Sequence, residues 1–272
     1  MARKKMMKPG HDSAAVKILS VAVIAMIACA LAGSLLWLNH EQNKRAGIDP
    51  ETLCPKAGPV AVTAVLVDRT DALNEIQAEA LARLMKTWAD AVPEGGAFHV
   101  YEVGMGGRLL APVVAVCNPG TGEEKSELIA NIDMLKKRYR EKYEAPIDAM
   151  IEAMRADSRA DTSPIMEGIQ AIAVRDFGPD QPKALKKKTL FIVSDLLQNG
   201  SGFSAYAGVP KLDEFMKSAA GQALKVSLDG VETWIYVLNR NSPKQTGVLL
   251  QFWMDWLTLQ GADIQEKRNI PG

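Results

Sequence analysis

Histidine, cysteine and aromatic residues are scarce in this chain of 272 residues. It contains three histidines and three cysteines, and phenylalanine, tryptophan and tyrosine together make up 6% of it. No second histidine lies near His99 to form a metal-binding pair, and Cys117 has no evident basic partner. The Gly-x-Ser-x-Gly elbow of α/β-hydrolases is also absent. Because no nucleophile with its base is recognisable, we expect that the protein is not an enzyme.

An excess of one charge sign is missing as well. The chain holds 32 basic residues (Lys and Arg) and 32 acidic residues (Asp and Glu). Residues 1–17 contain five of the basic and one of the acidic residues, which leaves 27 basic and 31 acidic residues in the rest of the chain. Nucleic-acid-binding proteins usually concentrate basic residues on one face. We therefore expect no nucleic-acid partner.

One long segment lacks charge altogether. Residues 18–38, ILSVAVIAMIACALAGSLLWL, contain no charged side chain. A helix of this length spans roughly 30 Å, the thickness of the hydrocarbon core of a membrane, and Trp37 stands at its end, where aromatic residues favour the interface. The basic residues 1–17 are predicted to form a cytoplasmic tail. We expect a single-pass protein of the bacterial inner membrane, with the chain after Asn39 in the periplasm.

Two other interpretations of this segment are less favoured. A cleaved signal peptide usually has an apolar region of only about 7 to 15 residues. A lipoprotein signal that ends at Cys29 is disfavoured because apolar residues continue beyond that cysteine. An uncleaved transmembrane anchor is therefore the preferred interpretation.

Residues 39–57 are polar, contain two prolines and have no periodicity, so we expect a short stalk there. Cys54 and Cys117 are the cysteines outside the apolar segment. In an oxidising compartment they could form a disulfide, or they could be two unrelated buried thiols. Spacing alone does not decide between these alternatives.

From residue 58 to residue 272, strand patterns alternate with helix patterns, which predicts one folded domain. Apolar or alternating runs predict strands at 60–67, 97–103, 108–117, 189–195 and 231–239. Helical spacing predicts helices at 73–88, 128–139, 146–155, 165–172, 212–224 and 246–261, with a break at Pro146. This alternation favours an α/β fold with a doubly wound, mostly parallel sheet.

Aspartates follow two of the predicted strands. Asp68 ends the run VLVDRTD and Asp195 lies in LFIVSDLLQNG, while DTSPIMEGI opens the helix between them. The carboxyl ends of parallel strands meet at one edge of the sheet, where such folds bind ligands. We therefore expect Asp68 and Asp195 to lie side by side.

These three motifs, in this order, resemble the loops of a von Willebrand factor A (vWA) domain. The resemblance covers roughly residues 58–262. The stretches CNPG, SPIMEGI, SDLLQ and GFSAY further resemble a largely uncharacterised group of membrane-anchored bacterial proteins of this type. The resemblance implies a Rossmann-like fold whose three loops converge on a divalent cation, the metal-ion-dependent adhesion site.

In that family the first loop reads Asp-x-Ser-x-Ser, the second loop supplies a threonine and the third an aspartate. The resemblance thus implies a Mg²⁺ site formed by oxygen ligands. The second hydroxyl position is Ala72, which has no ligand atom, and Asp71 is a possible replacement. The implied set of metal ligands is Asp68, Thr70, Asp71, Thr162 or Ser163, and Asp195.

A purely structural interpretation of the same loop is favoured over metal binding, because the set of metal ligands is incomplete. Asp68 could accept backbone hydrogen bonds from its own loop, and Thr70 could cap the following helix. In that case no metal would be bound.

We expect a membrane-tethered binding module that recognises a protein partner at the strand-end face. The alternative is a structural component of a cell-envelope complex without metal, which docks through the aromatic face of Trp253 and Trp256. A Mg²⁺-dependent phosphohydrolase built around Asp68 is disfavoured, because Thr70 stands where the general acid would be needed.

Overall fold

A computed structural model describes residues 13–103, 111–122, 131–156, 158–182, 185–200 and 202–272, and within the first helix the side chains of residues 21–37. The chain divides into two units, Met1–Ile48 and Asp49–Gly272.

The first unit contains one long helix, α1 (Ser13–Ala46). In the part of the chain that the structure describes, no helix is both long enough and apolar enough to cross a membrane. The predicted transmembrane segment 18–38 falls on α1, and the side chains of residues 18–20 and 38 lie outside the described ones. Residues 1–12 of the predicted tail are outside the described residues as well.

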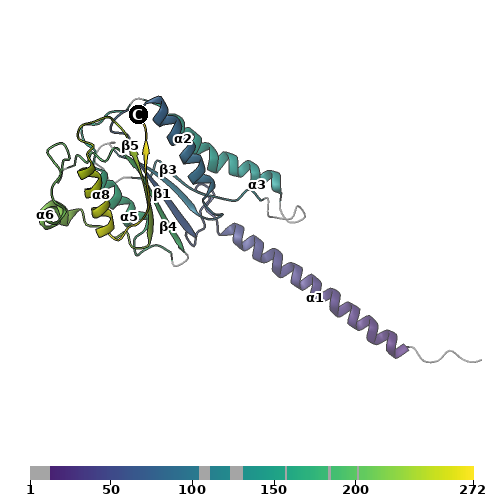
Figure 1. Cartoon of the computed structure of the whole chain (residues 1–272). Helices are drawn as coiled ribbons and strands as arrows, with labels where there is room; N and C mark the ends of the chain where they lie inside the picture. The colour runs from purple at the N-terminus through teal and green to yellow at the C-terminus, as the bar shows by residue number, and fades with distance from the viewer. Residues whose placement is uncertain (1–12, 104–110, 123–130, 157, 183–184, 201) are drawn as a thin grey trace, which may run out of the picture. The chain divides into compact units, whose positions relative to one another are not determined.

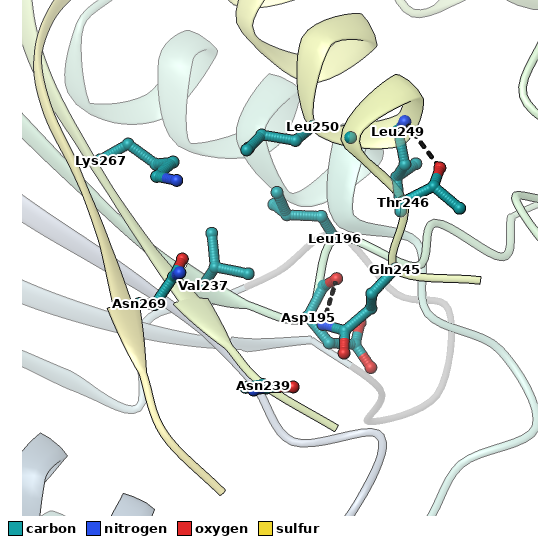
Figure 2. Close-up of a pocket in the computed structure, with 11 residues that line it drawn as sticks. Asp195, Leu196, Val237, Asn239, Gln245, Thr246, Leu249, Leu250, Lys267 and Asn269 are labelled. Atoms are coloured by element: carbon teal, nitrogen blue, oxygen red, sulfur yellow. Dashed lines mark hydrogen bonds between the residues drawn. The ribbon is translucent and has the colours of Figure 1, made fainter. Parts of the chain in front are cut away.

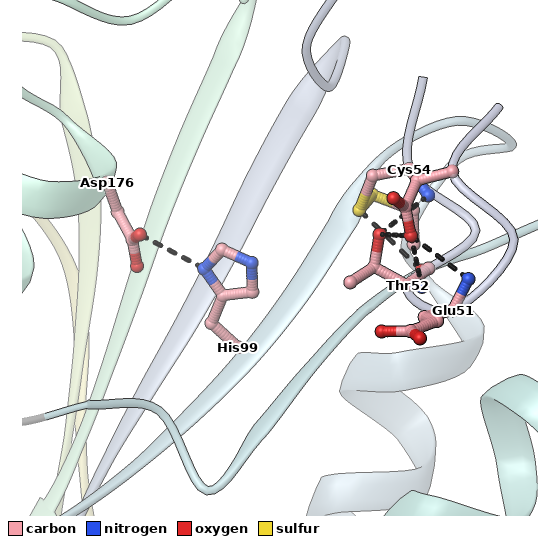
Figure 3. Close-up of a disulfide and its surroundings, with 7 residues drawn as sticks. Glu51, Thr52, Cys54, His99 and Asp176 are labelled. Atoms are coloured by element: carbon pink, nitrogen blue, oxygen red, sulfur yellow. Dashed lines mark hydrogen bonds and ion pairs between the residues drawn. A yellow bond between two sulfur atoms is a disulfide. The ribbon is translucent and has the colours of Figure 1, made fainter. Parts of the chain in front are cut away.

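The second unit begins at Asp49, within the predicted stalk 39–57. Cys54 forms a disulfide with Cys117 (Figure 3). Of the two alternatives, a disulfide or two unrelated thiols, the structure contains the disulfide. The backbone N–H of Cys117 also donates to the carbonyl of Thr52, at 2.8 Å. Both contacts attach the beginning of the unit to its sheet.

The sheet of the second unit has six strands in the order β3-β2-β1-β4-β5-β6. β3 is antiparallel to β2 and the other neighbours are parallel, which confirms the predicted doubly wound, mostly parallel sheet. The strands are β1 (Ala61–Asp68), β2 (Ala97–Val103), β3 (Val114–Cys117), β4 (Lys187–Ser194), β5 (Val231–Leu238) and β6 (Asp263–Ile270).

Helices cover both faces of this sheet (Figure 1). Every residue of β1 is buried, as expected of a strand covered on both sides. One face packs against α2 (Glu75–Asp90) and α4 (Ala145–Ala153). The other face packs against α5 (Ile165–Asp176), α6 (Leu212–Lys217), α7 (Ala219–Ala223) and α8 (Gly247–Leu259).

The helix around Pro146 is continuous, so the predicted break there is wrong. α3 (Ile132–Tyr139) leads into a π-helical turn, η1 (Arg140–Glu144), and then directly into α4. Proline lacks an N–H and its ring clashes with the carbonyl four residues earlier in an α-helix. The wider π turn before Pro146 avoids that clash, and the helix continues.

The aromatic residues of α8 belong to the core. Trp253 and Trp256 are fully buried, and the indole N–H of Trp253 donates to the carbonyl of Leu196 at 2.8 Å. They therefore cannot form an exposed docking face. The prediction that a structural component docks through these two tryptophans is wrong. His99 on β2 contacts the buried carboxylate of Asp176 at 3.0 Å (Figure 3), so it too has a structural partner.

Candidate functional site

The candidate site lies where the strand order reverses. β1 pairs with β2 on one side and with β4 on the other, and doubly wound sheets bind ligands at the carboxyl ends of such strands. Asp68 is the last residue of β1, and Asp195 directly follows β4. The hydroxyl of Ser194, next to Asp195, donates to Asp68 at 2.7 Å. The expectation that the two aspartates meet at one edge is confirmed.

The carboxylate of Asp68 accepts four hydrogen bonds. Its Oδ1 accepts from the backbone N–H and the hydroxyl of Thr70, at 3.1 and 2.7 Å. Its Oδ2 accepts from the hydroxyls of Ser163 and Ser194, at 3.2 and 2.7 Å. An ionised carboxylate has about four acceptor positions. Asp68 is therefore saturated by its own surroundings and holds three loops together.

Asp195 has a different environment. Its side chain is only 4% exposed, its Oδ1 accepts from the N–H of Leu197 at 2.8 Å, and within the described residues its Oδ2 accepts no hydrogen bond. Burial, and after it the negative charge of Asp68, raise the pKa of Asp195 to about 7, against the lowering effect of the Leu197 hydrogen bond and of Arg240. Asp195 thus holds unsatisfied acceptor capacity and excess negative potential.

The second and third loops are joined through their backbones. Ser163 and Asn199 exchange two backbone hydrogen bonds, of 2.9 and 2.8 Å. The side chain of Gln198, which is fully buried, accepts from the N–H of Met166 in the first turn of α5. Leu196 adopts a left-handed backbone conformation with φ of 64°, which is uncommon for a residue other than glycine. The hydrogen bond from the N–H of Leu197 to the carboxylate of Asp195 spans this turn. Ser163 is therefore held in a fixed position beside Asp68.

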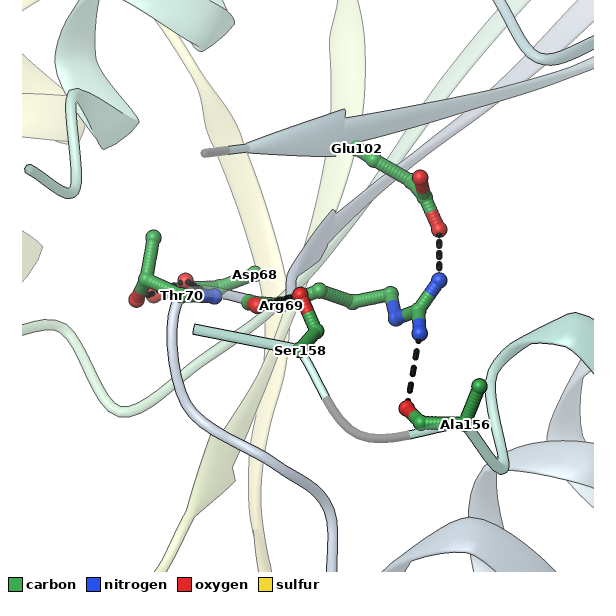
Figure 4. A network of polar contacts seen from close by, with 6 residues as sticks. All are labelled: Asp68, Arg69, Thr70, Glu102, Ala156 and Ser158. Atoms are coloured by element: carbon green, nitrogen blue, oxygen red, sulfur yellow. Dashed lines mark hydrogen bonds and ion pairs between the residues drawn. The ribbon is translucent and has the colours of Figure 1, made fainter. Parts of the chain in front are cut away.

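An arginine within the first loop attaches it to the neighbouring strand (Figure 4). Arg69 forms an ion pair with Glu102 of β2, at 2.6 Å, and both side chains are largely buried. Its guanidinium also donates to the carbonyl of Ala156, and the hydroxyl of Ser158 donates to the carbonyl of Arg69. Because buried ion pairs with additional hydrogen bonds have a fixed geometry, this network sets the direction of the loop beyond Asp68.

A second arginine holds the other end of the loop. Arg240, which follows β5, donates to the carbonyls of Ala72 and Asp71, at 2.5 and 3.1 Å. Its Nε is buried without a hydrogen-bond partner among the described residues. Ala72 stands where vWA domains have their second serine. The loop is held at this position by Arg240, which follows β5.

The structure brings together four of the predicted ligands, Asp68, Thr70, Ser163 and Asp195, all of which are buried. The side chains of Asp71 and Thr162 are exposed, although the negative charge of Asp71 contributes to the raised pKa of Asp195. Between Thr162 and Ser163, it is therefore Ser163 that joins Asp68. Ser194 was missed by the sequence analysis, although a hydroxyl at a strand end directly before an aspartate was a usable signal.

Two cavities flank the paired aspartates. One, of about 570 Å³, is lined by Thr70, Asp71, Ala72, Arg159, Ala160, Asp161 and Arg240. The other, of about 240 Å³, lies between β5, β6 and the start of α8 (Figure 2) and has Asp195, Gln245 and Lys267 among its polar lining residues. Asp195 lines the second of these cavities, so a ligand bound there can reach it.

Within the described ranges, no group of three or more histidine, cysteine, aspartate or glutamate side chains is arranged to hold a metal ion. The donor set at the strand ends is instead two carboxylates and three hydroxyls, those of Thr70, Ser163 and Ser194. Hard cations such as Mg²⁺ bind oxygen ligands of this kind and retain several waters. With the open Oδ2 of Asp195, the chemistry of the donor set fits such an ion.

Comparison with known proteins gives structural neighbours only. No protein-family model matches the chain, and no curated protein matches it. A von Willebrand factor type A protein from Catenulispora acidiphila is similar over 78% of this chain and 39% of its own, with 15% identity and a TM-score of 0.42. This chain therefore spans well under half the length of that protein.

Two proteins from Bacteroides are also similar to the chain. The conserved hypothetical protein BatB from Bacteroides thetaiotaomicron is similar over 77% of this chain and 90% of its own, with 11% identity and a TM-score of 0.38. An aerotolerance-related membrane protein from Bacteroides fragilis is similar over 65% of this chain and 66% of its own, with 14% identity and a TM-score of 0.30.

Proposed function

We propose that the protein is a membrane-tethered, vWA-like binding module that recognises a protein partner at the strand-end face. The observation that carries this proposal is the open Oδ2 of the buried Asp195, beside the saturated carboxylate of Asp68. A buried acid with raised pKa, in an accessible crevice, is a frequent property of ligand sites.

In this proposal the immediate ligand of Asp195 is Mg²⁺. The hydroxyls of Thr70, Ser163 and Ser194 supply further oxygens, and Asp68 fixes their positions by accepting hydrogen bonds from them. The cation offsets the negative charge of the two aspartates. An acidic side chain of the partner completes its coordination shell. Asp71 and Thr162, also predicted as ligands, stand at the exposed rim of the site.

The site binds in this proposal and does not catalyse. A phosphohydrolase would need a general acid at residue 70, and the Thr70 hydroxyl donates instead to Asp68 at 2.7 Å. That hydrogen bond supports a positioning role for Thr70.

The tether in this proposal is the uncharged segment 18–38, with residues 1–17 in the cytoplasm and the second unit in the periplasm. The disulfide Cys54–Cys117 supports this location, because such bonds form and persist in oxidising compartments. Protease protection in intact spheroplasts tests it. The folded unit should be digested from outside while a tag on residue 1 is protected.

Metal titration of the full chain in detergent tests the site. We expect millimolar Mg²⁺ or Mn²⁺ to raise the melting temperature and to release or absorb heat in calorimetry. Asp195→Asn should remove both effects, while the matched control Asp213→Asn, at an exposed position of α6, should leave them unchanged. Absence of heat and of a thermal shift in the wild type would exclude the cation.

A metal-free module is the second candidate, and Arg240 favours it. This residue holds the loop at Asp71 and Ala72 and lowers the pKa of Asp195, as a cation at the site would. In that case partner binding, measured by co-purification, persists in EDTA and is lost with Arg240→Gln.

A further inference from the structure

The two edges of the sheet differ strongly in exposure. β3 has four residues, of which three are buried. β6 has eight residues, of which six are exposed, and within the described residues no strand pairs with its outer side. The outer backbone groups of an edge strand can pair with an added strand. β6 is therefore the accessible edge of this sheet.

Helices overhang both faces of this edge and form a groove on each. The groove between α2 and β6 has a volume of about 280 Å³. Its apolar lining residues are Ala80, Leu84, Tyr236, Ile270 and Pro271. On the other face lies the cavity beside α8, and Asn269 of β6 lines both. Side chains of a strand added beside β6 would point alternately toward these two grooves.

The groove between α2 and β6 has a positive charge. Arg83 and Arg268 line it, and no carboxylate does. Each arginine has a neighbour outside the lining, Glu79 at 3.4 Å from Arg83 and Glu266 at 2.8 Å from Arg268. These pairs lie on the exposed surface, where water and salt screen an ion pair and leave it weak. An incoming carboxylate can therefore compete for both arginines.

We propose that β6 accepts an extended acidic segment of a partner protein as an additional strand. The backbone of that segment pairs with the outer edge of β6, and its acidic side chains contact Arg83 and Arg268, while apolar side chains cover Leu84 and Ile270. The register of β6 against β5 shifts between Thr233 and Trp234, before the regular pairing of residues 266–270. Because a bulge bends the edge, we place the added strand along residues 266–270.

A second copy of this chain fits the edge less well. In a symmetric antiparallel pair of β6 strands, the residue on the two-fold axis faces its own copy. Lys267 and Arg268 lie near the middle of the regular part of β6. Centring the pair on either of them brings like charges together, which is destabilising. The acidic segment of another protein avoids this repulsion.

Site-specific cross-linking in the native membrane tests the proposal. The photoreactive amino acid p-benzoylphenylalanine replaces Asn269 in the full chain, and the cross-linked peptide is identified by mass spectrometry. We expect one adduct, with a segment of another protein that contains Asp or Glu. The same amino acid at Val174, an exposed position of α5, is the control and should not give this adduct.

Charge variants provide the second measurement. Arg83→Glu with Arg268→Glu should lower the adduct yield about tenfold or more, while Arg83→Lys with Arg268→Lys should retain most of it. The melting temperature of each variant shows that it is folded.

Three outcomes would overturn the proposal. An adduct with β6 of a second copy makes the edge a homodimer interface. An adduct whose yield is unchanged by the charge reversal would show that acidic side chains of the partner are not recognised. If the photoreactive residue is incorporated at position 269 and no adduct forms, β6 is not a docking surface.

Discussion

Asp68 and Asp195 occupy equivalent positions in the fold but have opposite environments. Both stand at the carboxyl ends of neighbouring parallel strands and both are buried. Among the residues that the structure describes, Asp68 accepts four hydrogen bonds, whereas the carboxylate of Asp195 accepts one and has a raised pKa. The difference indicates a division of roles, in which Asp68 organises the loops and Asp195 is available to a ligand.

The largest expected effect is that of Asp68→Ala. The substitution leaves four donors without their acceptor in a buried site, so we expect a loss of about 3 to 5 kcal/mol in the free energy of unfolding. Denaturation by urea measures it. Asp161→Ala, at an exposed position, is the control and should change stability by less than about 0.5 kcal/mol. A loss below about 1 kcal/mol would contradict the organising role.

Asp195→Asn should raise the free energy of unfolding, in contrast to Asp68→Ala. Because the folded-state pKa of Asp195 is raised from 3.8 to about 7, its contribution to stability is fully present below pH 3.8 and is lost as the pH rises through about 7. At 1.36 kcal/mol per unit, the asparagine variant should be more stable than the wild type by on the order of 2 to 4 kcal/mol at pH 8 without divalent cations.

Urea denaturation between pH 5 and pH 8 checks this prediction. The stability of the wild type should fall over that interval relative to the variant. Parallel pH profiles of the two proteins would show that Asp195 has no raised pKa, and saturating Mg²⁺ should narrow the difference at pH 8 if the ion binds.

Ser194 should contribute more to the stability of the fold than Ser163, because its hydrogen bonds are shorter and more numerous. Ser194 donates to Asp68 at 2.7 Å and also accepts from the N–H of Leu196, whereas Ser163 donates at 3.2 Å. Hydrogen bonds to charged groups contribute roughly 1.5 to 3 kcal/mol, so Ser194→Ala should cost about 2 kcal/mol and Ser163→Ala about 1 kcal/mol. The reverse order in thermal or urea unfolding would contradict the proposed geometry.

The smallest effect on stability is expected for Ala72→Ser. This position is partly exposed, so the change should alter stability by less than about 0.5 kcal/mol. The added hydroxyl should tighten Mg²⁺ binding in calorimetry, because it restores a missing oxygen. Thr162→Ala, at an exposed position, should leave the binding unchanged. A Thr162→Ala variant that loses the metal would instead make Thr162 a ligand.

The central strands were predictable because burial on both faces leaves a strong pattern. The predicted strand 97–103 coincides with β2, and those at 60–67 and 189–195 differ from β1 and β4 by at most two residues at either end. β6 was not predicted, because most of its residues are exposed and polar and a β-bulge interrupts its pairing with β5. A strand of that kind is defined by its backbone pairing with β5 and has no periodic signal.

Part of the site was predictable from strand ends and part was not. Asp68 and Asp195 follow from the rule that parallel strands end at one edge. Ser163 could not be separated from Thr162, because the choice depends on the bridge to Asn199. Arg240 could not be found at all, since it reaches the first loop from a residue 168 positions away in sequence.

The disulfide Cys54–Cys117 has a mechanical consequence for a tethered protein. A pull that enters the folded unit at Asp49 reaches Cys54 and crosses the sulfur bridge to Cys117, at the end of β3. Residues 54–117 form a covalent ring closed by this bond, so the covalent path from Asp49 to the later part of the chain bypasses the backbone of residues 55–116. Asp68 lies within this ring, and the covalent path of such a pull therefore does not run through its loop.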